Sequence, residues 1–190
     1  MTGRGYERII SSIKLNDEIK KLDIPGACVG VCTKALGGNV NLFDITPIEE
    51  GNLFPAMVTC FPFTKGVDMD TWYEIPHGVD DNVELLRSYL EDKGFVEGES
   101  KRKFVGHFLV YHNTDQNGIE LYNHCVAIPE RDTLPRDQRK IFKKTDSWLI
   151  IDTLSESGYA VATTSGLASK INELIESGME VQITKAYLRK

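Results

Sequence analysis

The sequence predicts an α+β protein in which a mostly antiparallel sheet or partial barrel packs against three to four helices. Segments with helical spacing of apolar residues do not alternate regularly with β-type segments, which argues against a doubly wound parallel sheet. The two clearest β-type segments, 104–111 and 119–128, are joined directly by a short turn, as antiparallel neighbours are. No Pro- or Ser-rich linker divides the chain, so residues 1–190 are expected to form a single compact domain.

The first third of the chain is predicted to hold one helix and three strands. Apolar residues recur at near-helical spacing over 6–22, and Pro25-Gly26 ends this helix. The uncharged apolar run 27–32 is typical of a strand, and a glycine turn connects it to a second strand at 40–45, as in a hairpin. Residues 57–61 predict a third strand.

A capped helix and a hairpin follow in the middle of the chain. Asp81 is a good N-cap residue, and Glu84 completes a capping box for a helix that ends at Gly94. The segments 104–111 and 119–128 are connected by a turn with an Asn-Gly pair, which permits positive φ. These two segments therefore predict an antiparallel hairpin.

The C-terminal third continues with helices and strands. The predicted elements are a helix at 135–144, a strand at 159–162, a helix at 167–177 and a strand at 179–188. Thr164 or Ser165 caps the second of these helices, and Gly178 ends it. Periodicity leaves open whether 147–153 extends the first helix or forms a strand.

Composition narrows the environment in which the protein is expected to work. No apolar run approaches the ~20 residues that a bilayer span requires, so no membrane association is expected. The first residues contain no continuous apolar stretch and no cleavage site, which predicts a cytoplasmic protein. The cysteines are expected to be reduced thiols, mostly in the core; they are Cys28, Cys32, Cys60 and Cys125. The close pair among them has no matching second pair of zinc ligands, so neither a metal nor another cofactor is expected.

The charge of −6 is distributed unevenly along the chain. Residues 44–99 contain thirteen acidic and three basic residues, whereas 100–144 contain nine basic and five acidic ones. The protein is therefore expected to present two faces of opposite charge.

The basic region after the central hairpin suggests the leading functional hypothesis. Basic side chains bind phosphates, and aromatic rings stack on unpaired bases. We therefore expect a non-enzymatic accessory protein, of a kind often found in viruses, that binds RNA or single-stranded DNA. The candidate contact residues are Lys101, Arg102, Lys103, Arg136, Arg139, Lys140, Lys143, Lys144 and Trp148. A solvated helix face balanced by nearby carboxylates is the alternative.

Two other functions fit the sequence. The acidic region 44–99 suggests an inhibitor or adaptor that binds a basic groove on a partner protein. His107 and His124 lie on the two strands of the central hairpin, where paired imidazoles would serve as acid and base in a phosphodiester hydrolase.

The assembly state follows from the apolar run around Cys28–Cys32. As a strand without charge, it is expected at the centre of the sheet, or at an edge that pairs between two copies. The protein is thus predicted to be a monomer or a homodimer.

The closing stretch from Tyr159 through Gly178 to Ala186 resembles the end of HIRAN domains, small β-barrels that bind single-stranded DNA ends. The resemblance covers about thirty residues, lacks the turn rich in asparagine and aspartate of that family, and assigns no site residue.

Overall fold

A computed structural model describes residues 3–24, 27–45, 53–93, 102–117 and 120–189. Within these ranges it contains six α-helices and an open sheet of seven antiparallel strands, which confirms the predicted α+β class. The helices are α1 (Gly3–Leu22), α2 (Cys28–Ala35), α3 (Leu53–Thr64), α4 (Val79–Glu91), α5 (Arg136–Lys144) and α6 (Thr164–Glu176). None of these helices is both long and apolar enough to cross a membrane.

The sheet follows the order β1-β7-β3-β4-β5-β6, and β2 also pairs with β7. Its strands are β1 (Val67–Met69), β2 (Tyr73–Glu74), β3 (Lys103–Thr114), β4 (Glu120–Pro129), β5 (Ser147–Ile151), β6 (Tyr159–Thr163) and β7 (Glu180–Leu188). The predicted central hairpin is confirmed as β3 and β4, with Gly106 opposite Pro129 and Tyr111 opposite His124. The ambiguous segment after α5 is the strand β5.

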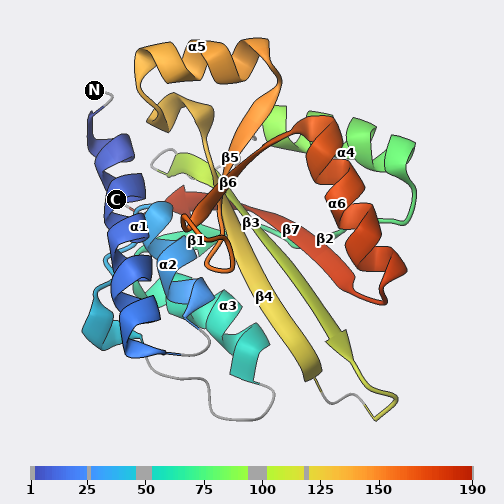
Figure 1. Ribbon diagram of the computed structural model, residues 1–190, viewed down its shortest axis with the longest axis horizontal. Helices are drawn as coiled ribbons and strands as arrows, with labels where there is room; N and C mark the ends of the chain where they lie inside the picture. The colour runs from blue at the N-terminus through green and yellow to red at the C-terminus, as the bar shows by residue number, and fades with distance from the viewer. Residues whose placement is uncertain (1–2, 25–26, 46–52, 94–101, 118–119, 190) are drawn as a thin grey trace.

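Helices cover both faces of the sheet (Figure 1). The helices α1, α2 and α3 lie on one face, whereas α4 and α6 lie on the other. Successive side chains of a strand point to opposite faces, so Phe108 of β3 packs into the first core and Leu109 into the second. The two cores explain why the central strands carry almost unbroken apolar runs.

The prediction of a strand at 27–32 is wrong, because this segment forms the buried helix α2. Val29, Val31 and Cys32 are each 0% exposed, so the helix is surrounded by protein rather than lying on a surface. An apolar run buried on all sides shows no helical stripe, which is why its periodicity resembles that of a buried strand. The expected central strand, or intersubunit pairing of that strand, is thereby replaced by a helix packed on the sheet.

The neighbouring strand predictions also fail. Residues 57–61 belong to α3, which is apolar along much of its length. Residues 42–44 form a short 3₁₀ turn, in which the Phe43 N–H donates to the Asn41 side chain. The predicted N-terminal hairpin does not form, because neither of its two predicted strands, 27–32 and 40–45, is a strand.

The start of α4 differs from the predicted capping box. Gly78 is the N-cap residue, with φ of 134°, so Asp81 lies within the first helical turn. A carboxylate there still interacts favourably with the positive end of the helix dipole. The helix ends at Glu91, and the predicted stop at Gly94 lies outside the described residues.

The C-terminal helices agree closely with prediction. Helix α5 occupies Arg136–Lys144, and α6 occupies Thr164–Glu176. The cap of α6 is Thr163, one residue before the expected position, and its hydroxyl accepts a hydrogen bond from the Gly166 N–H.

Candidate active site

The predicted nucleic-acid contacts fall into exposed and paired groups. Arg136, Lys140 and Lys144 are exposed on α5. Arg139 and Lys143 of the same helix pair with Asp132, at 3.4 and 3.3 Å. Helix α5 therefore has three of its five basic side chains exposed outside this ion-pair cluster.

The other predicted contacts lie apart from α5. Arg102 pairs with Asp68 at 3.2 Å, and Lys103 is exposed at the start of β3. Lys101 lies outside the described residues. The basic residues before the hairpin and those after it thus belong to separate elements.

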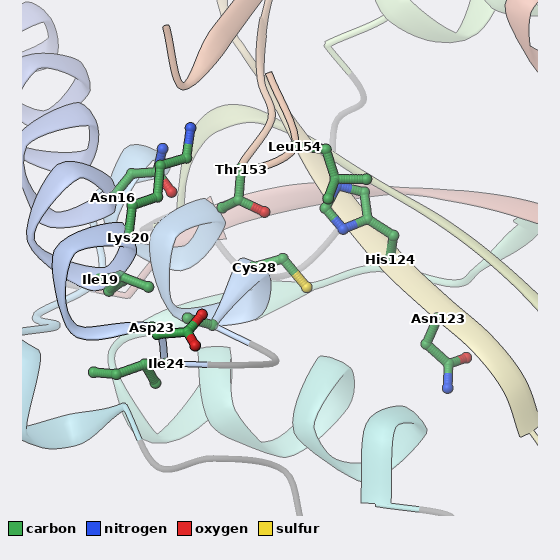
Figure 2. Close-up of a pocket in the computed structure, with 11 residues that line it drawn as sticks. Asn16, Ile19, Lys20, Asp23, Ile24, Cys28, Asn123, His124, Thr153 and Leu154 are labelled. Atoms are coloured by element: carbon green, nitrogen blue, oxygen red, sulfur yellow. The ribbon is translucent and has the colours of Figure 1, made fainter. Parts of the chain in front are cut away.

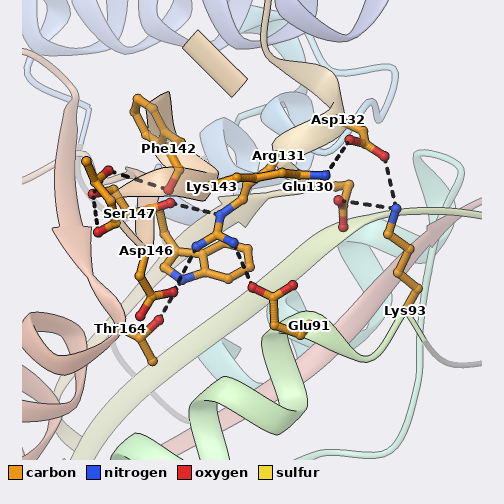
Figure 3. Close-up of polar contacts among 12 residues, drawn as sticks. Glu91, Lys93, Glu130, Arg131, Asp132, Phe142, Lys143, Asp146, Ser147 and Thr164 are labelled. Carbon is orange, nitrogen blue, oxygen red and sulfur yellow. Dashed lines mark hydrogen bonds and ion pairs between the residues drawn. The ribbon is translucent and has the colours of Figure 1, made fainter. Parts of the chain in front are cut away.

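Trp148 lies in the core, and the Arg131 side chain over its ring belongs to a polar cluster with Glu91 and Asp146, which Figure 3 shows. Its ring is 2% exposed, its Nε1–H donates to Thr164 Oγ1 at 2.9 Å, and the Arg131 guanidinium lies 3.5 Å from the ring centroid. The ring has no exposed face on which a base would stack. Arg131 also donates to the Ser147 carbonyl and pairs with Glu91 and Asp146, so the cluster ties α4 to β5.

The acidic half of the sequence is partly neutralised within the fold. Asp68 is buried on β1, where Arg102 and Arg189 pair with it. Asp44 pairs with Lys65 at 2.6 Å. Among the described residues of this half, most of the exposed carboxylates lie on β2 and α4; the exposed ones are Asp70, Glu74, Asp80, Asp81, Glu84, Glu91 and Asp92.

The two hairpin histidines are not brought together. His107 lies opposite Ile128 and His124 opposite Tyr111, so the rings are separated by four positions along the strands, roughly 13 Å. His107 is 1% exposed and packs against Tyr89 and Phe104. Burial and the nearby charge of Lys185 lower its pKa to about 3, so this ring is neutral at physiological pH.

His124 instead belongs to a Cys28–His124–Asp152 triad. Its Nε2 lies 2.8 Å from Asp152 Oδ1, and the Cys28 side chain lies close enough to the ring to raise the pKa of His124. Because Asp152 holds Nε2, Nδ1 is the nitrogen left for the sulfur. The three side chains come from the start of α2, from β4 and from the residue after β5.

The sheet explains how the triad assembles. Ala127 of β4 pairs with Ile151 of β5, and the chain then turns away at Asp152. His124 lies three residues before Ala127, beside the point at which the strands diverge. Helix α2 packs on β4 with its N-terminus at Cys28, which places the sulfur at this divergence. Asp152 Oδ1 also accepts from the Leu154 N–H, at 2.9 Å, and this fixes the carboxylate.

The environment favours a thiolate–imidazolium pair. Hydrogen bonds from Cys125 and His124 lower the pKa of Cys28 well below its usual value, against the opposing effect of burial. Burial alone would lower the pKa of His124, but Asp152 and Cys28 outweigh it and raise this pKa to about 9. Both shifts have the same direction: they favour the proton on His124 and the negative charge on Cys28 over the neutral pair.

The N-terminus of α2 adds to this stabilisation. The N–H groups of the first helical turn have no partners within the helix, and the dipole places partial positive charge there. The N-cap residue, Ala27, provides no side-chain hydrogen bond to them. A thiolate at this position is favoured, and the same N–H groups are suited to an oxyanion next to the sulfur.

A pocket of about 360 Å³ opens onto Cys28 and His124 (Figure 2). Its wall includes Asn16 and Lys20 of α1 and Leu154 of the β5–β6 loop. Asn16 is 1% exposed, and neither its amide nitrogen nor its amide oxygen has a hydrogen-bond partner in the described structure. A buried amide without partners is costly, so this wall is suited to a ligand that both accepts and donates hydrogen bonds.

Lys20 holds the loop that carries Asp152. Its Nζ donates to the Ser155 carbonyl at 2.6 Å and to the Glu156 carbonyl at 3.3 Å. The same charge helps to keep the pKa of Asp152 below its usual value, although burial opposes this and the His124 hydrogen bond contributes more.

The sequence prediction identified His124 in another role and missed Cys28 and Asp152 as site residues. Cys28 is the second residue of the apolar run 27–32, and no cap residue or one-sided apolar pattern marks it as the start of a helix. Asp152 follows a β-type segment, but no fixed spacing links it to the other two. Such triads are adjacent in space rather than in sequence.

Among the residues that the structure describes, no three or more His, Cys, Asp or Glu side chains are grouped so as to hold a metal ion. Comparison with protein-family models, curated protein sequences and solved structures finds no match for this chain. The site itself is therefore the basis for a functional conclusion.

Proposed function

We propose that this protein is a cysteine-dependent acyl-transfer enzyme, most simply a hydrolase of amides or esters. The observation that carries the proposal is the triad: Cys28 at a helix N-terminus lines one pocket with a His124 ring that Asp152 orients. A nucleophile, a base and a group that orients the base recur in acyl-transfer enzymes on unrelated folds. The adjoining pocket, with its unpartnered Asn16 amide, supplies a place for the substrate.

The chemistry follows from the charge distribution. The Cys28 thiolate attacks the substrate carbonyl carbon, and the N–H groups of the first turn of α2 stabilise the oxyanion. His124, as imidazolium, gives its proton to the leaving group, which leaves a thioester on Cys28. The neutral His124 then takes a proton from water, whose oxygen attacks the thioester and releases the acid. Asp152 fixes the ring and stabilises its charged form throughout.

Trapping the acyl-enzyme tests this proposal. Incubation with p-nitrophenyl acetate is expected to release p-nitrophenol in a burst and to leave an acetyl group on Cys28, located by peptide mass spectrometry. Cys60 provides the matched control, because it is an exposed cysteine outside the pocket. The burst should persist in Cys60→Ser and disappear in Cys28→Ser. Acetylation of Cys60 with Cys28 unmodified would reject the proposal.

Nucleic-acid binding is a second proposal, which the exposed cations of α5 favour. Arg136, Lys140 and Lys144 lie on one short helix, where they would contact a phosphate backbone. Replacing all three with alanine is expected to weaken binding of single-stranded RNA or DNA at low salt and to flatten its salt dependence. Unchanged affinity, or no binding by the wild type, would remove this proposal. The Cys28→Ser variant is the control with an intact α5.

A further inference from the structure

Three of the four cysteines meet where α2 packs on β4. Cys28 and Cys32 are four residues apart on α2, and therefore lie on the same side of the helix, facing Cys125 of β4. The Cys125 side chain lies close enough to Cys28 and to Cys32 to act on the pKa of both thiols. Cys32 Sγ additionally donates to the Cys125 carbonyl, at 3.5 Å.

Access to this cluster runs through Cys28. Cys28 lines the pocket, whereas Cys32 and Cys125 are both 0% exposed. A small oxidant that enters the pocket therefore meets the Cys28 sulfur first, and the buried Cys125 lies behind it where α2 packs on β4. This arrangement matches a reactive thiol with an adjacent resolving thiol.

We propose that Cys28 and Cys125 form a reversible disulfide when hydrogen peroxide enters the pocket, and that this disulfide switches off the nucleophile. The regulatory consequence rests on the proposed acyl-transfer function. The oxidation itself does not, because it uses the two sulfurs, the peroxide and a proton from His124, and needs no acyl substrate.

The chemistry proceeds in two steps. The Cys28 thiolate attacks one peroxide oxygen; an S–O bond forms, the O–O bond breaks, and the departing hydroxide takes a proton from His124 to become water. The sulfur is oxidised to a sulfenic acid and the peroxide is reduced. The Cys125 sulfur then attacks the Cys28 sulfur; an S–S bond forms, the S–O bond breaks, and the oxygen leaves as water with the Cys125 proton.

Reduction restores the enzyme, since two equivalents of an added thiol return both cysteines to the reduced state. The disulfide also protects Cys28 from further oxidation to the sulfinic acid, which simple thiols do not reverse. The resolving role of Cys125 thus has a consequence that can be measured separately from any catalytic activity.

The test uses the intact protein treated with hydrogen peroxide, blocked with N-ethylmaleimide and digested for mass spectrometry. We expect a peptide linked through Cys28 and Cys125, full return of both thiols on addition of dithiothreitol, and the same result in Cys60→Ser. In Cys125→Ser, a Cys28 sulfenic acid that reacts with dimedone should accumulate and pass to sulfinic acid.

Oxidation of wild-type Cys28 to sulfinic acid without the Cys125 link, or modification of Cys60 alone, would overturn the inference. The linked peptide without a p-nitrophenol burst would retain the disulfide and reject the proposed enzyme. A p-nitrophenol burst without the linked peptide would retain the proposed enzyme and reject the disulfide.

Discussion

His124 Nε2 lies 2.8 Å from Asp152 Oδ1, and the same ring lines the pocket beside Cys28. The carboxylate, together with Cys28, raises the pKa of His124 to about 9 in spite of burial, so the imidazolium persists at neutral pH. The pairing therefore fixes both the direction of the ring and its charge.

Replacing Asp152 with asparagine should shift the pH profile of acylation. In the wild type the acid form of His124 is lost as the pH rises through about 9, so the rate should fall there. Without the carboxylate the pKa of His124 falls, and the alkaline limb is expected to move to lower pH. Burst rates across the alkaline range measure this, and an alkaline limb that stays in place would contradict the assigned role of Asp152.

Lys20 is expected to position Asp152 without touching substrate chemistry. Lys20→Met removes the hydrogen bonds to the loop carbonyls and should slow acylation by roughly tenfold, since a small displacement of a catalytic group is costly. Lys20→Arg should recover most of the rate, because its guanidinium also donates to carbonyl oxygens. Lys21→Met, on the exposed neighbouring position, is the control. Equal rates for Lys20→Met and Lys21→Met would exclude the positioning role.

Arg131 should contribute far more to stability than the surface ion pairs beside it. Its side chain is 5% exposed and contacts Glu91, Asp146, the Ser147 carbonyl and the Trp148 ring. Arg131→Met is expected to lower the free energy of unfolding by about 3 kcal/mol. Lys143→Met, which removes one partner of the exposed Asp132, should cost less than about 1 kcal/mol. Urea denaturation compares the two, and similar losses would refute this assignment.

His107 should make stability depend on pH in acid. Its pKa in the folded protein is about 3, below the ordinary 6.5, so the unfolded chain binds a proton in this window that the folded chain does not. The contribution of His107 to the free energy of unfolding is therefore expected to be full above about pH 6.5 and to be lost as the pH falls toward 3. His107→Leu should reduce that slope by about one proton. An unchanged slope in unfolding experiments between these pH values would show that His107 titrates normally.

The fold was predictable from sequence where local patterns and burial agree. The β3–β4 hairpin and helices α5 and α6 have turn residues, caps and one-sided apolar patterns that indicate their structure locally. Helix α2 has none of these, because Val29 and Val31 are enclosed by other elements. Tertiary packing decides that this segment is helical, and the spacing of its apolar residues in the sequence does not reveal that packing.

The candidate site was hidden for the same reason. Once 27–32 is taken as a strand, Cys28 becomes an ordinary core thiol and its place at a helix N-terminus is lost. His124 was singled out, but its neighbours in space come from segments distant in the chain. The basic residues of α5, in contrast, are contiguous in sequence and stand out in composition whether or not they bind anything.

The reactivity of Cys28 tests the central claim most directly. Iodoacetamide at about pH 6 reacts slowly with an ordinary thiol and quickly with a thiolate that a neighbouring imidazolium stabilises. Peptide mass spectrometry over time should show Cys28 modified ahead of the exposed Cys60 in the wild type, although Cys28 is only 5% exposed. In His124→Ala that order should reverse. Faster modification of Cys60 in the wild type, or a Cys28 rate that His124→Ala leaves unchanged, would contradict the thiolate–imidazolium pair.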